Sequence, residues 1–221
     1  MHIKSHPSIL YFGTPVVLMS TKNPKGSDNL APISSVFWLG WRCIIGLGTA
    51  SQTAKNLLNT KECVLNLPSV NQAGSVNLLA KTTGSNPVSK GKIAKGYRFV
   101  ENKFEIAGLT KTPSETIKAV RVKECPVQME AVVEAIHGLA EEDVNQRGNI
   151  ITVELKITRV YLDESIILDN NPNRVDPDKW KPLIMSFQEF YTLGNKVHES
   201  TLAEIPENLY NTYDREFVLN G

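Results

Sequence analysis

The sequence predicts a mainly β chain of the α+β class, a β-barrel with short inserted helices rather than a regular alternation of strands and helices. Two observations indicate this. Apolar residues alternate with polar ones in a late segment, the period-two pattern of a half-buried strand, at Ile151, Val153, Leu155 and Ile157. Apolar positions at helical spacing gather instead in the first 82 residues, in two short segments.

The first strands are predicted from runs of β-branched residues and from the breakers between them. Residues 14–21, TPVVLMST, are rich in β-branched residues and predict a strand. Pro, Gly, Asp and Asn in residues 22–29 predict a turn. Extended structure resumes in residues 30–40, and RCIIGLG at 42–48 predicts a short buried strand.

Two short helices follow, separated by one strand. Ser51 or Thr49 can cap a helix through QTAKNLLNT, residues 52–60. Residues 63–68, CVLNLP, predict a strand that Pro68 ends. Residues 69–82 predict the second helix, because apolar residues recur there at helical spacing at Val70, Ala73, Val76, Leu79 and Ala80.

The rest of the chain reads as a loop, strands and an irregular tail. Residues 82–96 are polar, basic and rich in breakers, which predicts a surface loop. Strand signals return in KFEIAGL at 103–109, VQMEAVVEAIHGL at 127–139 and NIITVELKITRVYL at 149–162. Prolines punctuate the residues after 168. We therefore expect one domain over 1–221, with 169–221 as an irregular C-terminal extension.

Composition narrows the functional classes. The 221 residues are 41% hydrophobic and 21% charged, as in a soluble globular protein, and the formal net charge of +1 predicts no general attraction to nucleic acid or to a membrane. Cys43, Cys63 and Cys125 lie far apart in apolar stretches and predict free buried thiols. The first residues do not have the pattern of a signal peptide, so we expect a cytoplasmic protein.

The corner after the strand at 42–48 concentrates groups that bind anions. Helix-opening N–H groups of residues 52–54 point outward, and the helix dipole favours a negative charge there. Ser51 and Thr53 add hydroxyl donors, and Lys55 adds a full charge. Two or three bonds of about 1.5–3 kcal/mol each, with ring stacking, would approach the roughly 8 kcal/mol of micromolar binding. The pattern predicts a site for one phosphate.

Two other interpretations of this corner stay open on the residues alone. Ser51 and Thr49 could simply cap the helix while Lys55 points into water. A dinucleotide fold is the other, since Gly46 and Gly48 begin a GxGxx(G) pattern, but Ser51 replaces the third glycine. No acidic residue ends the next strand, where only Asn66 could meet a ribose.

The order of motifs resembles the flavin reductase-like, FMN-binding split-barrel family, which includes flavoredoxin-type proteins. The resemblance is carried by an apolar strand that ends in Thr21, a turn with Gly26, and the segment Asn29-Leu30-Ala31-Pro32-Ile33-Ser34. It continues through Ser51-Gln52-Thr53-Ala54-Lys55-Asn56 and Val64-Leu65-Asn66, and more weakly through VDPDKWKPL and FYTLGNKV near the end.

The resemblance implies a homodimer of split barrels with FMN at or near the subunit interface. It implies that Ser51, Thr53 and Lys55 hold the phosphate, and that residues 29–35 run along the isoalloxazine ring, with Asn29 and Ser34 as side-chain contacts. The complete cofactor-binding set is Met19, Ser20, Thr21, Asn29, Leu30, Ala31, Pro32, Ile33, Ser34, Ser35, Gly48, Ser51, Thr53 and Lys55. No catalytic side chain and no metal ligand is expected. Pro32 has no N–H, so its strand is predicted to be an edge.

Several residues could serve the site or only the structure. Some relatives carry a Gly-Asp-His segment associated with nicotinamide use, whereas this chain has only His137 there, without the Asp. The lysines of the basic loop could close over a phosphate or only face water, namely Lys90, Lys92 and Lys95. The tryptophans could cover a flavin or lie in the core, namely Trp38, Trp41 and Trp180.

The resemblance therefore implies an FMN-binding oxidoreductase that transfers a hydride from NADH or NADPH to flavin N5. Its electrons would pass to a free flavin, a metal or a partner protein. A flavoredoxin-like electron carrier without NAD(P)H turnover is the first alternative, and the missing Asp-His segment favours it. A non-enzymatic split-barrel module for another ligand is the second.

Overall fold

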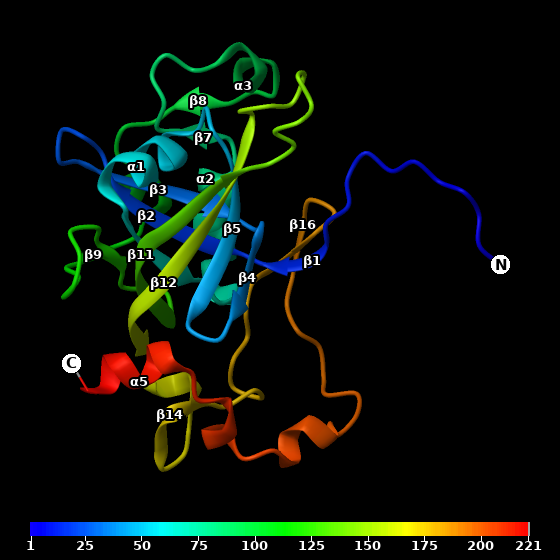
Figure 1. Ribbon diagram of the computed structural model, residues 1–221, viewed down its shortest axis with the longest axis vertical. Coiled ribbons are helices and arrows are strands. Elements are labelled where there is room, and N and C mark those ends of the chain that lie inside the picture. Colours follow the sequence, from blue (N-terminus) through cyan, green and yellow to red (C-terminus); the bar gives the residue numbers. More distant parts are fainter. Residues whose placement is uncertain (221) are drawn as a thin grey trace.

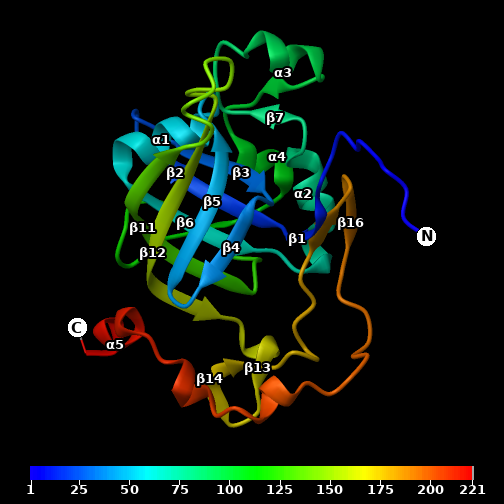
Figure 2. The ribbon, with the colours of Figure 1, turned by 45° about the vertical axis from the view of Figure 1, so that its right-hand side comes forward.

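The structure, a computed structural model, describes the backbone of residues 1–220 and the side chains of residues 1–216. Its main body is a curled antiparallel sheet of seven strands in the order β3-β2-β6-β11-β12-β5-β4 (Figures 1 and 2). The strands are β2 (Val17–Lys22), β3 (Asp28–Ile33), β4 (Val36–Leu39), β5 (Arg42–Gly48), β6 (Glu62–Leu67), β11 (Val127–Gly138) and β12 (Ile150–Leu162). The mainly β prediction is confirmed.

Short helices lie at one end and along one side of this barrel. They are α1 (Gln52–Thr60), the 3-10 turn η1 (Val70–Gln72), α2 (Ala73–Leu79), α3 (Lys90–Ala94) and α4 (Lys103–Ala107). Minor strands connect them, namely β7 (Thr82–Thr83), β8 (Arg98–Phe99), β9 (Lys111–Thr112) and β10 (Arg121–Val122). The two helices predicted before residue 83 are both present.

The residues after β12 run under and beside the barrel. A three-stranded sheet joins β1 (Phe12–Pro15) to β15 (Ile184–Ser186) and β16 (Glu189–Tyr191), so the start of the chain pairs with a segment about 170 residues later. The remaining elements are η2 (Glu164–Ile166), β13 (Ile167–Leu168), β14 (Asn171–Val175), η3 (Thr201–Glu204), η4 (Glu207–Tyr210) and α5 (Tyr213–Asn220). In Figure 1, β14 and α5 lie at the end of the barrel opposite α1 and α3.

Strand β2 is buried on both faces, which explains its unbroken apolar run. Val17 and Met19 face the barrel interior with Ile45, Leu65 and Val153. On the outer face, Val16 and Leu18 belong to a second apolar cluster formed with residues of α2 and α4, including Val76, Leu79 and Phe104. Because two cores share this strand, β3 beside it is held firmly where the candidate site begins.

The strand predicted in KFEIAGL is wrong, because residues 103–107 form α4. The side chain of Asn102 accepts a hydrogen bond from the N–H of Glu105, and Gly108 ends the helix in the left-handed conformation at φ 63°. Phe104 and Ala107, three residues apart, both turn toward the second cluster. A single helical turn suffices to bury that pair, and a short apolar segment carries no decisive period.

The loop prediction for 82–96 is only partly correct. The segment is largely exposed, but it contains α3 and the pair of strands β7 and β8. No helix among the described residues is long and apolar enough to cross a membrane. All three cysteines are buried and free, as expected.

Candidate functional site

Two adjoining cavities lie along β3, between the first turn of α1 and the sheet of β1 and β15. The smaller holds about 150 Å³. The larger holds about 600 Å³. The two share four lining residues, so they form one continuous groove, at Pro32, Ile33, Ala80 and Tyr97. One groove with a small and a large compartment suits a ligand with a compact end group and a broad body.

The smaller cavity abuts the N-terminus of α1. The Ser51 hydroxyl caps this helix by accepting a hydrogen bond of 3.1 Å from the N–H of Ala54. The N–H groups of residues 52 and 53 precede the first intrahelical bond, so they have no acceptor within the helix. Gln52 and Thr53 line the cavity together with Ser51. The positive end of the helix dipole therefore meets this compartment.

A buried network of amides and hydroxyls holds the first turn of α1 on the barrel. The Asn29 side-chain amide donates to Thr53 at 3.1 Å and to Thr21 at 3.2 Å. Asn56 donates to Thr21 at 2.9 Å and to Asn23. Because the Thr53 oxygen already accepts from Asn29, its hydroxyl proton is left to donate toward the cavity.

The opposite wall of the smaller cavity is the segment Thr82–Gly84. The Thr83 oxygen accepts from the N–H of Ser85 at 3.2 Å and from the Lys92 ammonium at 3.0 Å, so its own proton is also left to donate. A Cβ on Gly84 would lie 2.6 Å from the side-chain oxygen of Asn29 in β3 and 3.2 Å from the Gln52 side chain in α1. Only glycine lets this wall approach α1 so closely.

Two lysines supply the positive charge of the smaller cavity. Lys103 lines it with a side chain only 3% exposed, and among the described residues it has no hydrogen bond or ion pair. Burial lowers the pKa of the Lys103 ammonium to about 8, and repulsion from Lys92 acts in the same direction. Burial also lowers the pKa of Lys92, with Lys55 as a second cause. Like charges facing one cavity without an acid are costly unless an anion joins them.

The larger cavity runs beside the free edge of β3. β3 pairs only with β2, as expected from Pro32, so its outer N–H and C=O groups are open to the groove. The Ser35 hydroxyl hydrogen-bonds the Tyr11 hydroxyl at 3.1 Å, which ties the chain before β1 to the same wall. Met185 and Phe190 close the far side from β15 and β16.

The predicted cofactor-binding residues fall into three groups. Those that line the smaller cavity are Asn29, Ala31, Pro32, Ile33, Ser51 and Thr53. Those that line the larger are Pro32, Ile33, Ser34, Ser35 and Gly48. Those that line neither are Met19, Ser20, Thr21, Leu30 and Lys55.

The residues outside the groove have other roles in the structure. Met19 lies in the barrel core and Leu30 in the outer cluster. Ser20 donates to the backbone of Val120, and Thr21 belongs to the buried network under α1. Lys55 is exposed on the surface of α1, close enough to lower the pKa of Lys92.

The other residues discussed from the sequence divide in the same way. Lys92 lines the smaller cavity and Lys95 the larger, whereas Lys90 lines neither. His137 is exposed near the end of β11, and no tryptophan borders the groove. None of the described lining residues is a histidine, aspartate or glutamate, and the described residues contain no cluster of three or more metal-ligating side chains. The described groove therefore presents positive charge and hydroxyl donors on one side and an open strand edge on the other.

Lys103 and Thr83 were missed by the sequence reasoning. Lys103 lay inside a segment assigned to a strand, where a lysine is expected at the surface. The cap at Asn102 and the glycine at 108 were the available signals for a helix, and they would have put Lys103 at its first position.

The flavin reductase like domain family matches residues 9–194 of the chain. The Bacillus subtilis protein YdfE is 36% identical over 198 residues, covering 90% of this chain and 92% of the relative. Flavoredoxin of Desulfovibrio vulgaris (Miyazaki F) has a similar structure, with a TM-score of 0.73 and 20% identity, covering 93% of this chain and 100% of its own. Nitrilotriacetate monooxygenase component B from Bacillus cereus has a TM-score of 0.69 at 20% identity, covering 87% and 89%.

A Shewanella frigidimarina protein with a split barrel domain aligns with a TM-score of 0.66 and 20% identity, over 85% of each chain. At these identities the solved structures establish the fold, while the family match and the Bacillus subtilis relative establish the family. The chain is a split β-barrel and belongs to the flavin reductase-like domain family.

Proposed function

We propose that the protein is a cytoplasmic, FMN-binding oxidoreductase that accepts hydride from NADH or NADPH. Family membership supports a flavin-related oxidoreductase. The observation that supports a flavin with a single phosphate is the unpaired, buried Lys103 in a compartment of about 150 Å³ at the start of α1. That volume and charge suit one terminal phosphate, and the adjoining 600 Å³ suits a tricyclic ring.

The residues of the groove would contact different parts of FMN. Lys103 and Lys92 would neutralise the phosphate, the Thr53 and Thr83 hydroxyls would donate to its oxygens, and the first N–H groups of α1 would complete the cradle. The open edge of β3 would meet the polar rim of the ring through backbone groups. When bound, FMN supplies hydride acceptance at N5 and onward electron transfer, so no side chain of the groove needs to act as an acid or base.

Identifying the chromophore tests the proposal most directly. The purified protein is denatured and the released compound is identified by mass spectrometry, and the apoprotein is then titrated with FMN, riboflavin and FAD. We expect FMN to bind at least tenfold more tightly than riboflavin, because riboflavin lacks the phosphate. Equal affinity for FMN and riboflavin would contradict the phosphate site. If no flavin binds, the result would favour a non-enzymatic split-barrel module for a different ligand.

A flavoredoxin-like electron carrier is the second candidate. The exposed position of His137, away from the groove, and the missing Asp beside it favour this role. Mixing the FMN-loaded protein anaerobically with NADH or NADPH in a stopped-flow instrument separates the two functions. Rapid bleaching of the flavin absorbance supports the reductase, and bleaching only by a reduced protein partner or dithionite supports the carrier.

We also propose a homodimer. Large apolar side chains are exposed on β1, β16 and β4, namely Phe12, Tyr191, Phe37 and Leu39. Exposed apolar side chains of this size suit a protein interface. Light scattering coupled to size exclusion should give twice the 24.5 kDa chain mass. A single-chain mass at micromolar concentration would count against the dimer.

A further inference from the structure

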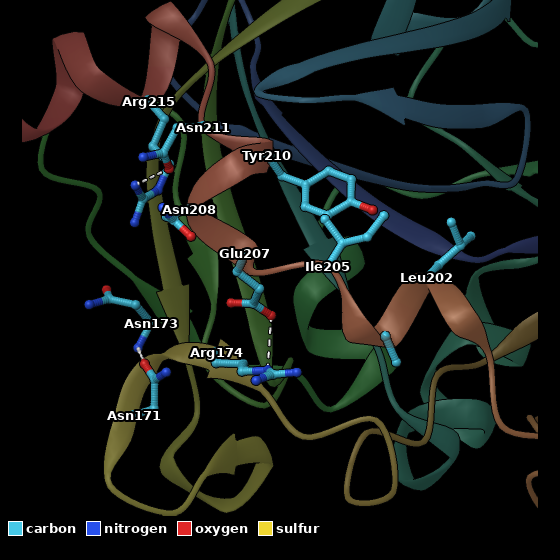
Figure 3. Close-up of a pocket in the computed structure, with 11 residues that line it drawn as sticks. Asn171, Asn173, Arg174, Leu202, Ile205, Glu207, Asn208, Tyr210, Asn211 and Arg215 are labelled. Carbon is cyan, nitrogen blue, oxygen red and sulfur yellow. Dashed lines mark hydrogen bonds and ion pairs between the residues drawn. The ribbon is translucent and has the colours of Figure 1, made fainter.

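A second pair of cavities lies at the other end of the barrel, under β14 and α5. One holds about 570 Å³ and is walled by Trp38, Trp41 and Met129. The other holds about 520 Å³ and is lined mostly by polar residues within 171–174 and 207–211, with Leu202, Ala203 and Ile205 beside them (Figure 3). Asn173 and Arg215 line both, so the two form one space with an apolar and a polar half. No residue of this space lines the groove along β3.

The apolar half has the composition of a small-molecule site. Trp38, Trp41, Val160, Leu162 and Val175 are partly buried and lie against the barrel core. Its described lining contains no carboxylate, and its charged groups are two arginines. Cavities of about 300–1,000 Å³ with apolar walls and a few convergent polar groups are typical of sites for small organic ligands.

Arg215 lies between the apolar and polar halves of this space and has no ion pair with a described acidic residue. Its guanidinium donates to the Asn211 side-chain oxygen at 2.6 Å, as Figure 3 shows, and no ion pair joins it to a described residue. By contrast, Arg174 in the polar half is paired with Glu207 at 2.9 Å. Arg159 in the apolar half meets Glu115 at 3.4 Å. The guanidinium of Arg215 is therefore the one best able to take an incoming anion.

The segment that carries Arg215 is held firmly against the barrel. Asp214 makes two hydrogen bonds to the Arg42 guanidinium, at 2.8 and 3.1 Å. Gly40 has a φ of 59°, and a Cβ there would lie 2.8 Å from the methyl carbon of Thr212. A wall fixed in this way is organised before any ligand arrives, which lowers the entropy cost of binding.

We propose that this space binds a small amphipathic anion, separately from the flavin. An aromatic or aliphatic body would lie against Trp38 and Trp41, and its carboxylate or sulfonate would pair with Arg215 beside the Asn173 and Asn208 amides. The site is independent of the proposed function, because it shares no lining residue with the groove along β3.

Two naphthalene probes test the site on the full chain saturated with FMN. 8-Anilinonaphthalene-1-sulfonate carries the anionic group, and N-phenyl-1-naphthylamine is its uncharged counterpart. We expect one sulfonate probe per chain, with energy transfer from tryptophan to the probe. Arg215→Gln should weaken the sulfonate probe at least tenfold and leave the uncharged probe within twofold.

Two further variants make the result specific. Arg215→Lys keeps the positive charge and should retain most of the affinity for the sulfonate probe. Arg147→Gln, on the hairpin at the other end of the barrel, should change nothing. The proposal is overturned if the sulfonate probe does not bind, if it binds the flavin-free chain but not the FMN-saturated chain, if Arg215→Gln leaves its affinity unchanged, or if Arg215→Gln weakens both probes equally.

Discussion

Replacing Lys103 by methionine should stabilise the apoprotein while weakening its hold on FMN. The two effects have the same cause, which is an ammonium buried without a partner. The Lys103 pKa is about 8 in the folded protein, against an ordinary 10.5. At about 1.36 kcal/mol per pKa unit, keeping this lysine charged costs on the order of 3 kcal/mol of folding free energy at neutral pH.

The sign of the pH dependence follows from the lowered pKa. Below about pH 8 the folded state bears the whole cost, and between about 8 and 10.5 the cost fades because the folded state loses its proton first. The wild-type apoprotein should therefore gain stability relative to Lys103→Met across that range. At pH 7 the variant should unfold at a temperature several degrees higher, since methionine fills a similar volume without a charge.

Lys103→Met should lower the affinity for FMN although it raises the stability of the apoprotein. Loss of one charge-assisted contact of about 1.5–3 kcal/mol raises the FMN dissociation constant roughly 10- to 150-fold. Riboflavin binding should be unchanged, because it has no phosphate. Flavin fluorescence quenching and thermal unfolding of the apoprotein measure the two effects, with the exposed Lys90→Met as the matched control. A variant that is less stable than wild type, or that loses FMN and riboflavin equally, would refute the reasoning.

Three other substitutions test separate parts of the structure. Ser51→Ala removes the cap of α1 and should lower the unfolding free energy by about 1 kcal/mol, measured by urea titration; no change would mean the cap is idle. Burial raises the pKa of the Glu130 carboxyl, but hydrogen bonds, first from the Thr116 hydroxyl, lower it below its ordinary value overall, so its stabilisation is present at neutral pH and lost on acidification. Glu130→Gln should cost about 1–3 kcal/mol at pH 7 and less near pH 3, and an equal cost at both would contradict this. Asp214→Asn breaks the pairing with Arg42 and should speed proteolysis of the C-terminal segment while β12 stays protected; unchanged cleavage would show that other contacts hold the segment.

The strands of the barrel could be predicted because their burial leaves a local pattern. The alternation from Ile151 to Ile157 is the record of one face turned to the core, and the structure places these residues in β12 with that face buried. Pro32 predicted an edge strand, because proline has no N–H to donate to a neighbouring strand within a sheet. The cap of α1 at Ser51 could be predicted for a similar reason, since helix capping depends on neighbours in sequence.

The site residues beyond that corner depended on contacts between distant segments. Lys103 is buried because α4 packs against α2 and the outer face of β2. The segment KFEIAGL by itself does not show that it packs against either element. Lys55, three residues from a favourable helix start, faces outward because successive helical side chains are about 100° apart. The cavity under the barrel is likewise assembled from β4, β12, β14 and α5, which are up to about 180 residues apart.

By itself the sequence determined the class of fold, most of the barrel strands, the two early helices and the cap at Ser51. These are set by side-chain periodicity, caps and breakers, which act over a few residues. Only the tertiary structure determines which lysines line the groove and which hydroxyls remain free to donate a hydrogen bond. It also places Arg215 between the two cavities at the other end of the barrel. The charge, burial and hydrogen bonding of these side chains depend on segments that come together only in the folded barrel. A local sequence pattern therefore could not predict them.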